Sequence, residues 1–258
     1  NMPSPANFDP STRREFIKKS TSVAVGGTLA ATLGTARYVH AAGNEQIRIG
    51  LIGCGGRGSG AAADALHAGP DIQLVAMADA FKEQLDHSRN VLKKQFAGQV
   101  AVNDDHCFVG LDAYKQLLAS DVDVVLLATP PGFRPLHFRA AVEANKHVFC
   151  EKPMATDAVG VRSIMESVEI SKKKNLSIVA GFCWRYQNVK QALFDQIHNG
   201  AIGELRCVHG TYLTSPVKPM PPASSRPAGM SDLEWMVRNW YNFTWLSGDG
   251  YVEQAMTV

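Results

Sequence analysis

Two short motifs near the middle of the chain each end a predicted strand, and one of them carries a lysine that can move a proton. Glu151-Lys152-Pro153 ends one short apolar run, and Thr129-Pro130 ends another. A lysine that is partly shielded from water can exchange a proton with a substrate hydroxyl, and a neighbouring carboxylate can hold its ammonium group. On spacing alone, a surface salt bridge is an equally good interpretation of Glu151 and Lys152. These two motifs alone therefore do not identify a reaction.

A glycine-rich motif closer to the amino terminus indicates a bound molecule that could lie beside them. Residues 53–58 read Gly-Cys-Gly-Gly-Arg-Gly, which fits the dinucleotide fingerprint G-x-G-x-x-G. The apolar run 47–52 precedes the motif, an Ala-rich helical stretch over 59–68 follows it, and the run 72–78 ends on Asp79, roughly 20 residues farther on. A glycine-rich turn that binds nothing would not need this strand, helix and acid. The context therefore favours a bound dinucleotide.

Each part of the fingerprint has a physical role in that interpretation. Gly53 permits a tight turn, Gly55 lets the backbone approach a pyrophosphate, and Gly58 lets helix and strand pack closely. The pyrophosphate would lie on the unpaired N–H groups at the positive end of the helix dipole. Asp79 would accept hydrogen bonds from the adenosine ribose and repel a 2′-phosphate, which favours NAD. The nearby Lys82 leaves some tolerance for NADP.

Length, charge and cysteine usage exclude several other classes. The 258 residues allow one large domain or two ordinary ones, and the net charge is +2. No cluster of Lys and Arg is interleaved with aromatic residues, which argues against a nucleic-acid partner. The five cysteines are scattered and the histidines show no ligand spacing, so neither a disulfide framework nor a metal site is predicted. We expect Cys54 and Cys150 to be small buried thiols.

The amino-terminal region resembles an export signal. Residues 13–17 read Arg-Arg-Glu-Phe-Ile, as in twin-arginine signals, and the uncharged stretch 20–36 is too weakly apolar for a good membrane span. Residues 39–41 are suited to a signal peptidase. We expect residues 1–41 to be a twin-arginine signal peptide of a periplasmic or otherwise exported protein, with no stable membrane span after processing. A disordered basic terminus and a retained anchor are the alternatives.

Export would constrain the chemistry. The twin-arginine route carries folded proteins, so a nucleotide bound in the cytoplasm can travel inside the protein. Because little free NAD is available outside the cytoplasm, such an enzyme should hold its cofactor tightly. It should also return the cofactor to its starting redox state in each turnover.

The remaining elements alternate between strand and helix up to residue 182. We expect strands over 121–129, 146–150 and 176–182 and helices over 82–96, 112–119, 136–145 and 157–174. The alternation predicts a doubly wound parallel sheet, a Rossmann domain over residues 44–182 that binds ligands at the carboxyl ends of its strands.

The pattern changes in the last part of the chain, residues 183–258. A helix is expected over 188–198, an antiparallel strand over 204–213, a proline-rich loop over 215–229 and a final strand over 249–258. We expect this part to belong to a second α+β domain with an open, largely antiparallel sheet that covers the mouth of the first. The chain looks like a fragment of a longer protein, which we expect to be a homo-oligomer when full length.

In combination, the motifs resemble the Gfo/Idh/MocA family, named after glucose–fructose oxidoreductase and inositol dehydrogenase. The resemblance runs from residue 47 to about 253 and rests on the fingerprint with Asp79, Thr129-Pro130, Glu151-Lys152-Pro153, Gly181-Phe182, Arg185-Tyr186 and Ala201-Ile202-Gly203-Glu204. It implies a Rossmann domain, a second open-sheet domain and NAD(P)-linked hydride transfer on sugars or cyclitols. It makes Lys152 the candidate catalytic lysine and Arg185, Tyr186 and Thr257 candidate substrate contacts. Candidate cofactor contacts are Gly53, Gly55, Gly56, Arg57, Gly58, Asp79, Thr129, Pro130, His137, Glu151 and Lys152.

One departure from the family pattern concerns the general base. The family usually carries an Asp, and a His four residues on, after a glycine-rich turn; here Glu253 takes the place of the acid and Thr257 that of the histidine. A threonine hydroxyl can hold a substrate hydroxyl but cannot titrate near neutral pH. The base is then Lys152, a tyrosine such as Tyr186 or Tyr251, or Glu253, or the protein has lost turnover.

Three functions remain open at this point. The leading hypothesis is an exported NAD-dependent oxidoreductase that acts on a carbohydrate or cyclitol hydroxyl. The second is an NAD-dependent glycoside-cleaving enzyme that oxidises a ring hydroxyl transiently, eliminates the aglycone and restores the hydride. The third is a nucleotide- and sugar-binding protein without turnover, which Thr257 suggests.

Overall fold

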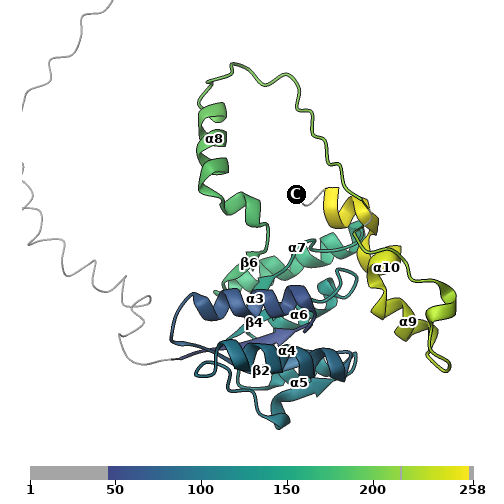
Figure 1. Cartoon of the computed structure of the whole chain (residues 1–258). Helices are drawn as coiled ribbons and strands as arrows, with labels where there is room; N and C mark the ends of the chain where they lie inside the picture. The colour runs from purple at the N-terminus through teal and green to yellow at the C-terminus, as the bar shows by residue number, and fades with distance from the viewer. Residues whose placement is uncertain (1–45, 216, 256–258) are drawn as a thin grey trace, which may run out of the picture. The chain divides into compact units, whose positions relative to one another are not determined.

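The structure, a computed structural model, describes residues 46–215 and 217–255 (Figure 1). Two predictions fall outside these residues: the signal peptide over residues 1–41 and the substrate contact of Thr257. Within the described residues, no helix combines the length and the apolar character needed to cross a bilayer.

Six parallel strands form one sheet in the order β3-β2-β1-β4-β5-β6. They are β1 (Ile47–Ile52), β2 (Ile72–Asp79), β3 (Cys107–Val109), β4 (Val124–Leu127), β5 (His147–Cys150) and β6 (Ile178–Ala180). β1 pairs with both β2 and β4, so the strand order reverses between β1 and β4, where doubly wound sheets open a crevice for ligands. The predicted Rossmann sheet is confirmed.

Five helices cover the two faces of this sheet. They are α3 (Gly56–His67), α4 (Lys82–Gln95), α5 (Ala113–Ala119), α6 (Arg134–Glu143) and α7 (Ala158–Lys173). One cluster of buried side chains joins the strands to α3 and α4 through residues such as Leu66 and Leu85. A second cluster joins them to α5, α6 and α7 through residues such as Leu117, Phe138 and Ile164. The sheet is therefore buried on both faces, and α3 and α4 lie in front of it in Figure 1.

Beyond β6 the described residues contain helices and turns but no strand. These elements are η2 (Cys183–Tyr186), α8 (Asn188–His198), η3 (Ala223–Ser225), α9 (Asp232–Arg238), η4 (Trp240–Asn242), α10 (Thr244–Ser247) and η5 (Tyr251–Ala255). The predicted strand over 204–213 is wrong, because this segment is exposed and has no regular structure. An extended segment needs a neighbour to pair its N–H and C=O groups, and no described segment pairs with it.

The predicted strand over 249–258 is also wrong where the structure describes it, since η5 is a π-helical turn. Asp249 has a φ of 65°, and its Oδ1 accepts a hydrogen bond from the backbone N of Tyr251 at 2.6 Å. Such a side-chain hydrogen bond favours a turn over an extended chain. The alternation that suggested a strand was too short to distinguish the two.

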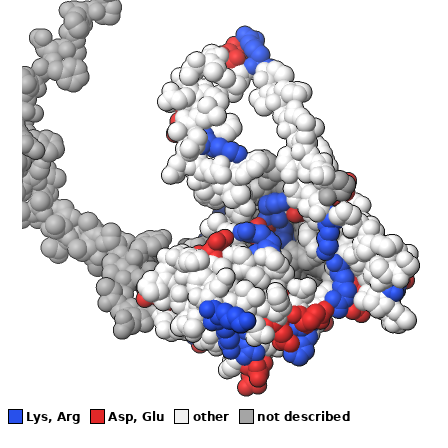
Figure 2. Space-filling model, in the orientation of Figure 1, with Lys and Arg blue, Asp and Glu red and all other residues white. Residues whose placement is uncertain are grey.

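The burial of the cysteines and the mixed signs of the surface charges match the expectations from the sequence. All five cysteines are free, and Cys54 and Cys150 are buried as predicted. Burial raises the pKa of Cys150 to about 11. Figure 2 shows basic and acidic side chains next to one another, and ion pairs such as Lys82–Asp86 and Arg89–Asp104 account for part of this pattern.

Candidate functional site

The turn between β1 and α3 is shaped by its glycines. Gly53 has a φ of +94°, and a methyl group added to Gly58 would lie only 1.8 Å from the carbonyl oxygen of Gly53. By contrast, Cβ atoms added to Gly55 and Gly56 would meet nothing within 4 Å. The outer glycines are thus required by the turn itself, whereas the middle two leave open space beside the backbone.

This open space fits an anionic ligand. α3 begins at Gly56, and no side chain caps its amino terminus. Its first N–H groups therefore remain available, and they lie at the positive end of the helix dipole. The pyrophosphate of a dinucleotide would be held here by the backbone of Gly55 and Gly56.

Asp79 lies at the end of β2, next to the glycine turn. Its Oδ2 accepts a hydrogen bond from the backbone N of Cys54 at 2.6 Å, and its Oδ1 accepts one from Phe81 at 2.9 Å. Burial raises the pKa of Asp79, although these backbone donors oppose the change. Each carboxylate oxygen has two lone pairs, so a ribose hydroxyl can still be accepted. Lys82 does not line the cavity beside Asp79 and instead pairs with Asp86 at 2.7 Å.

A cavity of about 370 Å³ lies at the carboxyl ends of the strands. Seven of the predicted cofactor residues line it: Gly53, Gly55, Gly56, Asp79, Thr129, Pro130 and His137. Four further lining residues come from the chain beyond β6 and were not predicted: Lys218, Val237, Arg238 and Trp240. Its size is in the range of small-molecule sites, at the position where doubly wound sheets bind ligands.

His137 combines a packing role with a place in the cavity wall. Its Nδ1 lies 3.2 Å from Oγ1 of Thr129, and its ring lies 4.3 Å from that of Tyr114, centroid to centroid. Burial, assisted by the charge of Arg134, lowers the pKa of His137 to about 4. The imidazole is therefore uncharged at neutral pH. Among the described residues, no group of three His, Cys, Asp or Glu side chains is placed to hold a metal ion.

Lys152 forms an ion pair with a residue from the distant η5 turn. Its Nζ donates to the backbone oxygen of Glu253 at 2.5 Å and lies 3.2 Å from Oε1 of the same residue. Burial raises the pKa of Glu253, whereas the charge of Lys152 acts in the opposite direction. The helical turn that replaced the predicted strand brings this carboxylate to the end of β5. The structure thus places two of the three candidate catalytic residues together at the end of β5, outside the lining of the cavity.

Glu151 contacts a different cation. Nε of Arg57 donates to Oε1 of Glu151 at 2.6 Å, and only 5% of Glu151 is exposed. This hydrogen bond raises the pKa of Arg57. The expectation that Glu151 would hold the ammonium of Lys152 is therefore replaced by two separate pairs. The pair of Arg57 and Glu151 connects the glycine turn to the end of β5.

Arg134 connects the Thr129-Pro130 and Glu151-Lys152-Pro153 turns, and the sequence analysis did not predict this role. Only 2% of it is exposed, and its two terminal nitrogens donate to the backbone oxygens of Thr129 and Pro153. Burial lowers its pKa, but a guanidinium stays charged in proteins. The residue type alone does not indicate burial, because an arginine in the first turn of a helix is usually exposed. Its position two residues after the Pro131-Gly132 turn was the available signal.

Two of the predicted substrate residues, Arg185 and Tyr186, lie among the described residues and are not brought to this site. Arg185 and Tyr186 lie on η2, neither lines the cavity, and 57% of Tyr186 is exposed. Tyr251 is exposed as well. The geometry therefore assembles a cofactor cavity and a lysine–glutamate pair. Neither tyrosine lines that cavity, and Tyr251 instead lines a separate hollow with Tyr212 and Tyr241.

Comparison with known proteins gives matches of the same kind. Residues 47–182 match the GFO_IDH_MocA family model, described as "Oxidoreductase family, NAD-binding Rossmann fold". The chain is 31% identical to inositol 2-dehydrogenase 4 of Saccharopolyspora erythraea over 169 residues, which cover 64% of this chain and 46% of that protein. It is 26% identical to a glycosyl hydrolase family 109 protein of Solibacter usitatus over 210 residues, covering 79% and 45%. The chain spans about half the length of these curated relatives.

A solved structure agrees on the fold. The WlbA dehydrogenase of Bordetella pertussis, in complex with NADH and UDP-GlcNAcA, is similar with a TM-score of 0.51 and 24% identity, covering 62% of this chain and 41% of that one. The family model covers more than half of the chain, and the sheet order and glycine turn described above are those of such a domain. The chain therefore belongs to the Gfo/Idh/MocA family of NAD-binding oxidoreductases.

Proposed function

We propose that this chain belongs to an NAD-dependent oxidoreductase that acts on a CH–OH group of a sugar or cyclitol. Its nucleotide domain spans residues 44–182, and residues 183–258 are part of the substrate domain. The observation that carries the proposal is the ion pair of Lys152 and Glu253, at the end of the strand next to β4. The name of the relative from S. erythraea supports the cyclitol class.

The two residues would divide the work at the substrate hydroxyl. When bound, NAD supplies the acceptor for the hydride that leaves the substrate carbon. Lys152 would exchange a proton with the substrate hydroxyl: it would take up the proton as the C–O bond becomes C=O and return it in the reverse direction. Glu253 holds Nζ of Lys152 in position through its backbone oxygen and its carboxylate. Arg134 fixes the turn beside Lys152 by donating to the oxygen of Pro153.

This arrangement favours Lys152 over the tyrosines as the base. A general base must be within hydrogen-bond reach of the proton it takes. Tyr186 and Tyr251 are both largely exposed, whereas Lys152 is partly buried and paired with Glu253 at the end of β5. Glu253 contacts Lys152 through its backbone oxygen and its carboxylate, and we assign it as the partner of the lysine.

A glycoside-cleaving enzyme is the second candidate. The observation that favours it is the similarity to a glycosyl hydrolase family 109 protein over a larger share of this chain. The same lysine would then act in a transient oxidation, followed by elimination of the aglycone and return of the hydride. Thr257, in the place of the family histidine, keeps a binding protein without turnover as the third candidate.

Export remains part of the proposal. The arginine pair in residues 13–17 and the following weakly apolar stretch support a twin-arginine signal and a periplasmic location. We also propose that the whole protein is a homo-oligomer. An exported enzyme of this kind would retain its cofactor through many turnovers.

The experiment starts from the full-length protein, from which any bound NAD is released by denaturation and measured. The protein is then given cyclitols, free sugars and glycosides with a chromogenic leaving group. A lasting rise in reduced nicotinamide supports the dehydrogenase, aglycone release without net reduction supports the glycoside-cleaving enzyme, and bound NAD with neither supports the binding protein.

Lys152→Met tests the assignment of the base. We expect turnover to fall by about 100-fold or more, which is typical for loss of a general acid–base group, while NAD binding is retained. Lys172→Met is the matched control, because Lys172 is an exposed lysine on α7 that forms an ion pair with Glu169. Turnover that survives Lys152→Met would exclude this lysine as the base.

A further inference from the structure

One segment that follows the residues matched by the family model contributes side chains to the lining of the cofactor cavity. We call residues 232–247 the strap; it comprises α9, η4 and α10. Val237, Arg238 and Trp240 of the strap line the cavity, and Val237 and Leu246 are buried. The strap is therefore packed against the nucleotide domain and forms one wall of the cavity.

The strap is attached at the end of β4 through its backbone. The N–H of Gly132 donates to the carbonyl oxygen of Leu246 at 2.8 Å. A methyl group on Gly132 would lie 2.4 Å from the oxygen of Trp245, so only glycine permits this approach. The rings of Phe133 and Trp245 meet edge to face at 6.1 Å between centroids. This attachment adjoins the wall made by Thr129, Pro130 and His137.

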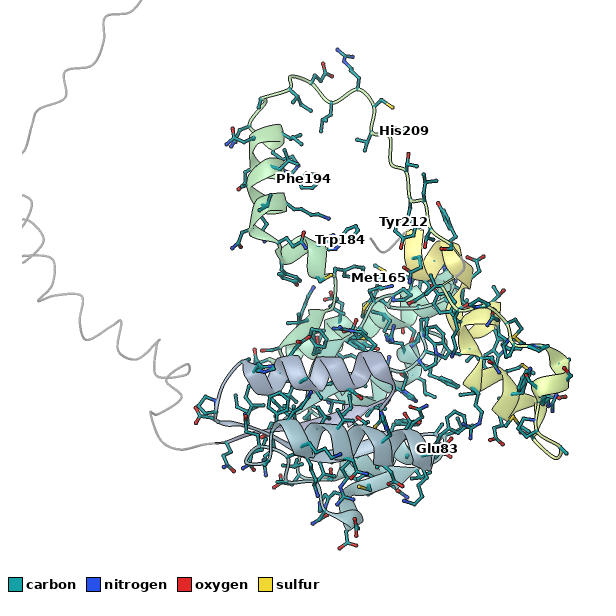
Figure 3. The ribbon with its side chains drawn as sticks, viewed as in Figure 1. Glu83, Met165, Trp184, Phe194, His209 and Tyr212 are labelled. Carbon is teal, nitrogen blue, oxygen red and sulfur yellow. The ribbon has the colours of Figure 1, made fainter. Side chains whose placement is uncertain are left out.

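A second attachment lies at the end of β2, beside Asp79. The guanidinium carbon of Arg238 lies 3.9 Å from the ring centroid of Phe81. The same guanidinium forms an ion pair with Glu83, 155 residues away in sequence, and another with Glu234 at 2.9 Å. Figure 3 shows Glu83 on α4, on the side of that helix where α9 lies. A planar cation is thus held over an aromatic ring at the rim of the cavity.

From these two attachments we propose that the strap retains the dinucleotide and that Arg238 and Trp240 are cofactor-binding residues at its adenosine end. The inference rests on the proposed function, which needs a cofactor that stays bound. A ligand on the glycine turn would be enclosed between the sheet and the strap. Arginine and tryptophan both stack on purine rings, and arginine also pairs with phosphate. Release then requires the strap to leave at least one attachment.

The test measures how fast bound nucleotide leaves. Full-length protein is loaded with etheno-NAD, a fluorescent analogue, and diluted into excess NAD. We expect Arg238→Ala to release the analogue about three- to tenfold faster, since it removes the ion pairs with Glu83 and Glu234 and a cation–π contact. Glu83→Gln, which keeps the arginine but removes its distant partner, should speed release about two- to fivefold. Arg206→Ala is the matched control, because Arg206 pairs only with Glu204 away from the cavity.

Each outcome decides between the two proposals. If the wild-type protein holds nucleotide and both Arg238→Ala and Glu83→Gln release it at the wild-type rate, the proposal that the strap retains the dinucleotide is refuted and the proposed function stands. If the wild-type protein takes up no nucleotide, the proposed function fails and the strap fails with it. Faster release from Arg206→Ala as well would mean a nonspecific effect and would also refute the strap. If circular dichroism shows that Arg238→Ala does not fold, Glu83→Gln decides alone.

Discussion

Replacing Gly58 by alanine should separate the packing role of the glycine turn from its binding role. The added methyl group would lie 1.8 Å from the carbonyl oxygen of Gly53, whereas ordinary contact begins at 3.4 Å. It would also lie 3.2 Å from Cβ of Ala128 on the neighbouring strand end. The obstacle is backbone, which cannot rotate away, so α3 and β1 must move apart. Overpacking of this kind costs about 3 kcal/mol.

The assay is thermal and urea unfolding without nucleotide. For a chain of this length, about 3 kcal/mol corresponds to a fall in melting temperature of about 6–12 °C. Gly60→Ala is the matched control in the same helix, because its methyl group would meet only Nη1 of Arg57, at 3.9 Å. That change should stabilise the helix by about 0.4–1 kcal/mol. If both variants unfold at the same midpoint, the close packing of α3 on β1 is refuted.

Three further predictions concern the same site. Gly55→Ala should fold nearly as well as wild type but lose NAD affinity in a binding titration, because its methyl group enters the open space beside the turn. The pKa of His137 is about 4 in the folded chain and near 6.5 in the unfolded one, so stability should fall by up to about 3 kcal/mol as the pH drops from 6.5 to 4. His137→Gln should lose less over that range in urea titrations, and an equal loss would contradict the assignment. Arg57→Ala should cost about 1–3 kcal/mol by leaving the buried Glu151 without its partner. Unfolding of Arg57→Ala and Glu151→Gln, alone and combined, measures their coupling, and purely additive effects would argue against the pair.

The Rossmann half of the molecule could be predicted because each of its signals is local. The run Ile47–Ile52, the glycine turn and Asp79 all fall within residues 47–79 and lie together in space. Strand ends meet at one edge of a parallel sheet, so Thr129 and His137 could also be assigned to the cavity before its geometry was known.

The ion pairs could not be predicted, because each joins distant parts of the chain. Lys152 meets Glu253 across 101 residues and Arg57 meets Glu151 across 94. Adjacency in sequence suggested Glu151 as the partner of Lys152, but neighbouring residues at a strand end point in opposite directions. The strands expected beyond β6 failed for a related reason. Alternating apolar and polar residues indicate which face of a strand would be exposed to solvent. They do not show that a neighbouring strand is present to pair with its backbone groups.

The polarity of the sheet has a practical consequence for work on this protein. All the residues assigned to nucleotide or proton transfer gather where the strands finish, whereas the opposite edge is held by contacts such as Arg48 with Asp123 and Lys146 with the oxygen of Val122. A spectroscopic label, a surface tether or a cross-linker attached on that opposite edge would report on the protein without touching its chemistry. Exposed Asp71 is a suitable position for such an attachment.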